Sequence, residues 1–105
     1  GNSTICEEMY DEGYTSIWNN DISFNVINKM KDKNRNNRPS LVFDVMDVCN
    51  MTYESEFFDL IIDKSTSDAL LCGDNAYYNV AKMLKECQRI LKTGGYFVAI
   101  SFGPP

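Results

Sequence analysis

The sequence predicts an α/β fold in which helices connect parallel strands. Two segments, FFDLIID (residues 57–63) and YFVAISF (residues 96–102), are nearly continuous apolar runs, which are typical of strands buried on both faces of a parallel sheet. Between them lies a predicted helix that ends at the glycines of KTGG. Its apolar residues recur at helical spacing and are Tyr77, Val80, Ala81, Leu84, Cys87 and Leu91. The order strand, helix, strand favours a right-handed crossover.

The first part of the chain is expected to contribute two more helices and two more strands. A helix is predicted over residues 4–12, because Ile5 and Met9 share a face and Gly13 can end it. A short strand follows and ends near Asp21.

Ser23 is a suitable N-cap for the second of these helices. One side of that helix is apolar and is formed by Val26, Ile27 and Met30. The segment LVFDVM (residues 41–46) is predicted to be a strand, and the charge of Asp44 in its middle favours a position at the edge of the sheet.

The composition restricts the class of protein. The 105 residues carry a formal net charge of −5, which argues against nucleic acid or an anionic membrane as the main partner. No apolar run approaches the ~20 residues of a membrane span. The chain has no histidine and its four cysteines form no C-x-x-C pair, so we expect no metal site. We interpret the cysteines as reduced thiols, which predicts a cytoplasmic protein.

The opening residues, GNSTICEE, have the pattern of a glycine-rich loop that runs into a helix. A doubly wound sheet does not easily start with a helix that covers nothing, so a strand is expected before it. We therefore expect residues 1–105 to be the central part of a single domain.

Aspartates follow three of the four predicted strands, and ligands of open α/β sheets bind beyond the carboxyl ends of the strands. Gly1 precedes Asp21 by 20 residues, which is the interval between a nucleotide-binding loop and an acidic residue that binds ribose hydroxyls. A carboxylate can accept two such hydrogen bonds at once. The alternative is that Asp21 caps the helix that follows it.

The other strand ends also carry candidate binding residues. Asp47, in VMDVCNM, could accept a hydrogen bond from the amino group of an adenine, with the N–H of Val48 nearby, or it could form a turn. Asp63 and Lys64 begin the segment DKSTSDALL. The glycines of a phosphate-binding loop are absent from the required positions, which excludes that interpretation. For Lys64 the alternative is a surface lysine paired with Asp63 or Asp68.

Together these segments resemble the class I S-adenosylmethionine-dependent methyltransferases, and within them the branch that includes lysine methyltransferases of translation elongation factors. The matching segments are GNS with the following helix, NNDIS, VMDV, FDLIIDKSTSDALL and LKECQRILKTGGYFVAIS. The resemblance implies a partial Rossmann-like sheet in which the visible strands are the second to the fifth. The first strand would lie between the second and the fourth, and two more would follow the fifth.

The resemblance also implies roles for individual residues. Gly1 would lie against the methionine part of S-adenosylmethionine, Asp21 would bind the ribose hydroxyls, and Ile22 would pack on the adenine. Contacts with the adenine edge are implied for Asp47 and Val48, and contacts with the methionine end for Asp63 and Lys64.

The leading hypothesis is an enzyme that methylates a protein lysine, with a translation elongation factor as a candidate substrate. A lysine with a pKa of about 10.4 must first lose its proton, and Asp63 or Asp68 could orient the amine. Ser65 and Ser67 replace the glycine and leucine that the branch usually has, which favours a non-catalytic binding module as the first alternative. An NAD-type Rossmann enzyme shares the glycine-to-aspartate spacing and is the second.

Overall fold

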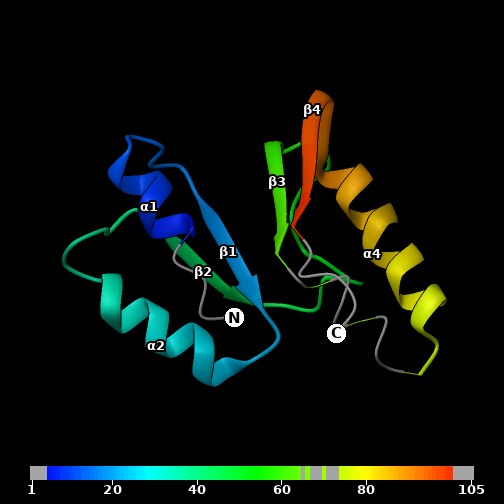
Figure 1. Cartoon of the computed structure of the whole chain (residues 1–105), viewed down its shortest axis with the longest axis horizontal. Helices are drawn as coiled ribbons and strands as arrows, with labels where there is room; N and C mark the ends of the chain where they lie inside the picture. Colours follow the sequence, from blue (N-terminus) through cyan, green and yellow to red (C-terminus); the bar gives the residue numbers. More distant parts are fainter. Residues whose placement is uncertain (1–4, 65, 67–69, 71–73, 101–105) are drawn as a thin grey trace. The chain divides into compact units, whose positions relative to one another are not determined.

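The computed structural model describes residues 5–64, 66, 70 and 74–100, and the chain forms two compact units, residues 1–48 and residues 49–105. The first unit contains α1 (Ile5–Asp11), β1 (Trp18–Asp21), α2 (Phe24–Asn34) and β2 (Val42–Val45) (Figure 1). The second unit contains β3 (Phe58–Lys64), α4 (Ala76–Ile90) and β4 (Leu91–Ile100). Among the elements that the structure describes in full, the predicted order of helices and strands is confirmed.

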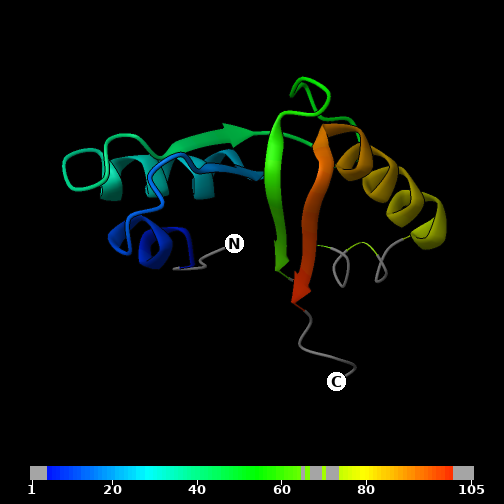
Figure 2. The same cartoon turned by 90° about the horizontal axis from the view of Figure 1, so that it is seen from above.

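The strands form two parallel pairs, β1 with β2 and β3 with β4. Figure 2 shows β3 and β4 running side by side in the same direction, with α4 next to them. The parallel pairing confirms the α/β prediction.

The core of the first unit forms where α1 and α2 pack against β2. Ser23 is the N-cap of α2, as predicted, and its Oγ accepts a hydrogen bond from the N–H of Val26 at 3.3 Å. The apolar side of α2 also lies where predicted. The buried residues of this core are Cys6, Ile27, Met30, Leu41 and Phe43.

Gly13 ends α1, as predicted, in a Schellman motif. Its φ angle is 107°, and its N–H donates to the carbonyl oxygen of Tyr10 at 3.0 Å. The N–H of Tyr14 donates to the carbonyl oxygen of Met9 at 3.0 Å, which completes the motif. The backbone at Gly13 therefore adopts a conformation that favours glycine.

The buried face of α1 differs from the predicted one. Cys6 is buried and Tyr10 packs against the core, whereas Ile5 and Met9 are only half-buried. A helix of 7 residues has about two turns, so the spacing of two apolar residues could not identify its packed face.

A buried carboxylate also joins α1 to the C-terminal end of α2. Glu7 is 5% exposed, and its Oε1 accepts a hydrogen bond from Lys33 Nζ at 3.0 Å. Arg38 lies 3.9 Å from Glu7 Oε2 and also donates to both carboxylate oxygens of Asp11 at 3.0 and 2.6 Å. Burial raises the pKa of Glu7, but the hydrogen bonds and charges of Lys33, Asn34 and Arg38 outweigh it, so the pKa lies below its ordinary value.

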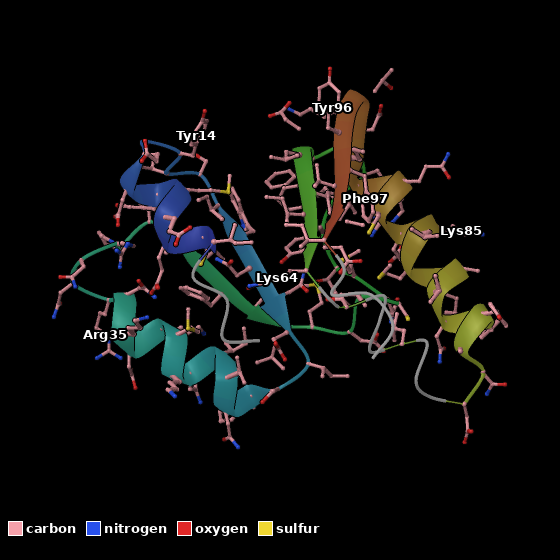
Figure 3. The ribbon with its side chains drawn as sticks, viewed as in Figure 1. Tyr14, Arg35, Lys64, Lys85, Tyr96 and Phe97 are labelled. Atoms are coloured by element: carbon pink, nitrogen blue, oxygen red, sulfur yellow. The ribbon has the colours of Figure 1, made fainter. Side chains whose placement is uncertain are left out.

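In the second unit, α4 packs on one face of the β3–β4 pair. The buried residues of α4 are Met83, Cys87 and Ile90, and Figure 3 shows Phe97 of β4 on the side next to α4. The helix itself is confirmed, but Tyr77 and Leu84, which the apolar pattern assigns to its buried face, are 87% and 46% exposed. The packed stripe is therefore narrower than the apolar pattern of the sequence.

The other face of the β3–β4 pair is exposed, so the prediction that these strands are buried on both faces was wrong for the described residues. Its exposed apolar residues, each at least 36% exposed, are Leu60, Ile62, Val98 and Ile100. Ile61 and Phe97, which alternate with them, are half-buried. An apolar run shows which side chains can be buried, but burial also requires an element that covers them.

β4 begins at Leu91, directly after α4 ends at Ile90, so KTGG lies inside the strand and not at the helix end. The pairing with β3 is irregular there. Phe58 lies opposite Leu91, but Leu60 lies opposite Tyr96, so β4 holds more residues than β3 over this stretch.

Two glycines accommodate this irregularity. Gly94 has a φ angle of 84°, which other residues rarely adopt. A Cβ atom on Gly95 would lie 2.8 Å from the carbonyl oxygen of Asp59 and 2.9 Å from that of Lys92. The backbone of β4 therefore approaches β3 so closely that there is no room for a side chain at position 95.

We expect Gly95→Ala to destabilise the complete protein by about 3 kcal/mol, because the added methyl group would overlap two backbone carbonyl oxygens. Gly13→Ala is the matched control, since its methyl group meets open space and only the positive φ angle costs about 1 kcal/mol. Urea unfolding measures both losses. Equal losses for the two variants would contradict the steric explanation.

Candidate functional site

The ends of β1 and β2 bring two of the predicted site segments to one edge of the first unit's sheet. The strands are parallel with Asp21 opposite Val45, and the N–H of Met46 donates to the carbonyl oxygen of Asp21 at 2.9 Å. Asp47 follows two residues after Val45, with its side chain exposed, and Val48 begins a turn. The residues predicted for the ribose and for the adenine edge therefore leave the sheet at the same end.

Asp21 supports the start of α2 without being its cap. The side chain is half-buried, and Oδ1 accepts the N–H of Ser23 at 2.8 Å, while Ser23 itself is the N-cap. The next residue, Ile22, is 74% exposed. This edge thus offers a carboxylate beside an exposed apolar side chain.

Asp63 and Lys64 end β3, and their side chains lie on opposite faces of the strand because side chains alternate. Asp63 is 8% exposed, and its Oδ1 accepts the N–H of Thr66 at 2.9 Å. Lys64 is half-buried at the carboxyl end of β3 (Figure 3). The structure therefore separates these two side chains, and the observed contact of Asp63 holds the backbone N–H of Thr66.

Asp63 lies on the same face of β3 as half-buried Ile61, which is the face that α4 covers, and this agrees with its low exposure. Burial, and then the negative charges of Asp63 and Glu86, raise the pKa of the Cys87 thiol in α4 to about 11. Cys87, like Cys6, is a buried thiol that forms no disulfide.

Two predicted site residues, Gly1 and Asp68, lie outside the described residues, as do Ser65 and Ser67. The contact of Gly1 with the methionine part of the cofactor and the orienting role of Asp68 stay predictions.

Arg89 organises the segment before β3, and the sequence analysis did not identify it. Its Nη2 donates to the carbonyl oxygen of Met51 at 2.9 Å, and its Nη1 donates to that of Tyr53 at 2.8 Å. Glu86 accepts the N–H of Met51 at 2.7 Å through Oε1 and Arg89 Nε at 2.7 Å through Oε2. The only signal in the sequence is a Glu–Arg pair at i,i+3, a common helix pair that does not indicate a distant backbone partner.

Neither a metal-ligand cluster nor a membrane-spanning helix is found in the described part of the chain. Residues 5–64, 66, 70 and 74–100 contain no group of three or more His, Cys, Asp or Glu side chains that could hold a metal ion. Within the same residues, no helix is both long and apolar enough to cross a membrane.

Comparison with protein families adds a second kind of evidence to this geometry. A family model described as a methyltransferase domain matches residues 1–99. The chain belongs to this family. The resemblance to class I S-adenosylmethionine-dependent methyltransferases is thereby confirmed, and so is the partial Rossmann-like fold. Proteins with this domain generally use S-adenosylmethionine as methyl donor.

Several curated relatives of this methyltransferase domain are named for eEF1A. The chain is 40% identical over 103 residues to the eEF1A lysine and N-terminal methyltransferases of Bos taurus and Homo sapiens, which covers 96% of this chain and 15% of each relative. It is 30% identical over 113 residues to EEF1A lysine methyltransferase 4 of Mus musculus, which covers 100% of this chain and 44% of that relative. The chain therefore spans less than half the length of these relatives.

A solved structure supports the fold independently. The PH0226 protein of Pyrococcus horikoshii OT3 superposes on 90% of this methyltransferase chain with a TM-score of 0.78, and the match covers 42% of that protein. The two sequences are 22% identical, so this likeness concerns the fold alone.

We expect Cys87 to make this methyltransferase domain less stable as the pH rises from about 9 to about 11. The unfolded thiol ionises near pH 9.0 and the folded thiol near pH 11, so the unfolded state loses its proton first and is favoured within this window. The loss is absent below pH 9 and reaches about 2 kcal/mol at pH 11.

The check is urea unfolding across this pH range for the unchanged protein and for Cys87→Ala, which lacks the thiol. Asp63→Asn serves as a second comparison, because removing its negative charge lowers the pKa of Cys87 and reduces the loss. The same pH slope in the unchanged protein and in Cys87→Ala would contradict the assignment.

Proposed function

We propose that the protein containing this chain binds S-adenosylmethionine and methylates a lysine side chain of another protein, with a translation elongation factor as the candidate substrate and the cytoplasm as its location. The family and the names of the relatives support this proposal. The observation that carries it is the common edge at which Asp21 and Asp47 leave parallel strands, next to exposed Ile22.

The residues at this edge fit the nucleoside part of the donor. The Asp21 carboxylate, held by the N–H of Ser23, suits the two ribose hydroxyls. Exposed Ile22 suits the face of the adenine, and the carboxylate of Asp47 with the N–H of Val48 suits its amino edge. For the methionine part we retain the predicted contacts of Gly1, Asp63 and Lys64.

Methyl transfer requires little covalent chemistry from the protein. S-adenosylmethionine supplies a methyl group on a positively charged sulfur. A neutral amine can attack the methyl carbon in line with the carbon–sulfur bond, and the sulfur then leaves as a thioether. The chain therefore has to position the amine and exclude water. Asp63 contributes by fixing Thr66 at the start of the segment that contains Asp68. Asp68 is our candidate for the group that orients the lysine amine once it has lost its proton.

We expect Asp21→Asn to weaken S-adenosylmethionine binding about tenfold to hundredfold, because charge-assisted hydrogen bonds to the ribose become neutral ones. The asparagine oxygen can still accept the N–H of Ser23, so the start of α2 is retained. Isothermal titration calorimetry of the complete protein measures the change. Asp32→Asn is the matched control, since this exposed carboxylate on α2 pairs with Arg35 at i,i+3.

Absence of saturable binding in the unchanged protein, or equal losses in Asp21→Asn and Asp32→Asn, would contradict the cofactor assignment.

We expect labelled methyl groups to be transferred from S-adenosylmethionine to lysines of eEF1A, and mass spectrometry locates them. Eukaryotic eEF1A whose lysines are unmethylated is the substrate, and heat-inactivated enzyme is the control. If the label were found only on the N-terminal amine of eEF1A, the methyl acceptor would be that amine and not a lysine. Tight binding without transfer to eEF1A or to any protein of a cell extract would favour the non-catalytic module. The comparisons lend no support to this module or to an NAD-type enzyme.

A further inference from the structure

We propose that the first unit binds an extended acidic segment of a partner protein in a groove between α2 and the outer edge of β2. The groove has a volume of about 470 Å³, and all the described residues that line it belong to residues 1–48. None of these lining residues is among those predicted to bind S-adenosylmethionine. The groove is therefore a binding surface additional to the proposed methyl-transfer site and does not depend on it.

The outer edge of β2 offers backbone groups to which another strand can bind. Among the described residues, β2 pairs with β1 alone. The N–H of Val42 donates to the carbonyl oxygen of Ile17, just before β1, at 3.0 Å, so the backbone groups of Val42 face β1. Successive residues of a strand direct their backbone groups to opposite edges, so those of Phe43 and Val45 face away from β1. An edge of this kind can pair with a strand from another chain.

The groove follows this edge along the strand. Residues 41–44 all line it, which corresponds to a length of about 10 Å. Leu41 and Phe43 are 8% and 6% exposed and give the groove an apolar floor. A groove that runs along an edge strand suits an extended peptide, whose main chain pairs with the edge while its side chains determine specificity.

The wall opposite β2 is basic. Every lysine and arginine of residues 1–48 lies between positions 29 and 38, although the whole chain carries a net charge of −5. Lys31, Arg35 and Arg38 line the groove, and Figure 3 shows Arg35 at the carboxyl-terminal end of α2. Lys31 and Arg35 are four residues apart, so they lie on the same side of the helix. A local positive charge in an acidic chain favours an acidic partner.

Lys31 and Arg35 are the cations that suit the recognition of acidic side chains. Arg38 is 20% exposed and donates to both carboxylate oxygens of Asp11 at 3.0 and 2.6 Å, so it serves as part of the wall. Arg35 pairs with Asp32, but these two side chains are 71% and 70% exposed. Exposed pairs contribute little stability, so a carboxylate of the partner can replace Asp32.

The two faces of β2 determine which side chains the bound segment should carry. Phe43 lies in the core that α2 covers, whereas Val42 and Asp44 alternate with it and belong to the opposite face. Every second side chain of an added strand would lie on the face of α2, near Lys31 and Arg35, and should be acidic. The others would lie beside Val42 and Asp44, where an apolar side chain fits and an acidic one is repelled. We therefore expect a segment that alternates acidic and apolar residues.

Two other occupants fit this groove less well. Two-fold pairing of the β2 edges of two copies would bring the same basic wall of each copy into the interface, where like charges repel. A nucleic acid offers phosphates to the wall, but it lacks the alternating backbone donors and acceptors that an edge strand pairs with.

The first test measures binding of a labelled peptide of about six residues, the usual length of a strand, in which glutamate alternates with valine. Fluorescence anisotropy follows its binding to the complete protein. We expect Lys31→Gln to weaken binding about fivefold, because one charge-assisted contact is lost. Lys29→Gln is the matched control, since Lys29 is exposed on the same helix but does not line the groove, and it should retain the affinity.

Four results would overturn the proposal. The first is that the unchanged protein does not bind the peptide, and the second is that the two variants lose equal affinity. The third is equally tight binding of a peptide with its glutamates and valines in two separate blocks, because the alternation would then be irrelevant. The fourth is tighter binding of a single-stranded RNA of equal charge, which would indicate a site for phosphates.

A second test needs no variant and so covers the case in which Lys31→Gln does not fold. Methyl groups are placed on the backbone nitrogens of either the glutamates or the valines of the peptide. An added strand directs only one of these two sets of N–H groups at β2. We expect methylation of one set to weaken binding about tenfold and methylation of the other to leave it nearly unchanged. Equal effects of the two sets would contradict pairing along the strand edge.

Discussion

Parallel strand pairing is the constraint on which the rest of this structure depends. Two parallel strands cannot be joined by a tight turn, so a helix must carry the chain back each time, as α2 does between β1 and β2 and α4 between β3 and β4. The same geometry sends both strands of a pair out of the sheet at one edge. Asp21 and Asp47 share an edge for this reason, although 25 residues lie between them.

Local signals in the sequence predicted local structure well. Ser23 starts α2 and Gly13 ends α1, because a cap or a positive φ angle depends on the few residues beside it. Burial was predicted less well. The apolar residues of β3 and α4 indicated which side chains are suited to a core, but Leu60 and Leu84 are exposed because packing depends on which element lies opposite.

The same difference between local and long-range features applies to the residues of the candidate site. The sequence placed Asp21, Asp47 and Asp63 at strand ends because strand ends are visible in its apolar pattern. It could not show that Asp63 and Lys64 face opposite sides, since that requires the strand to extend through Lys64. Arg89 could not be found, because the two backbone carbonyl groups that its side chain binds lie 36 and 38 residues earlier and no side chain there marks them.

The close backbone approach at Gly95 affects how amino-acid substitutions in such proteins should be interpreted. A position without room for a Cβ atom accepts only glycine, whatever reaction the protein catalyses. In a library of random substitutions this residue would be among the least tolerant, and its intolerance would be easily mistaken for a role in binding a cofactor. A substitution that removes the charge of Asp21 tests its role in binding, whereas substitutions of Gly95 test only whether added side-chain volume fits. Intolerance at these two positions therefore has different meanings.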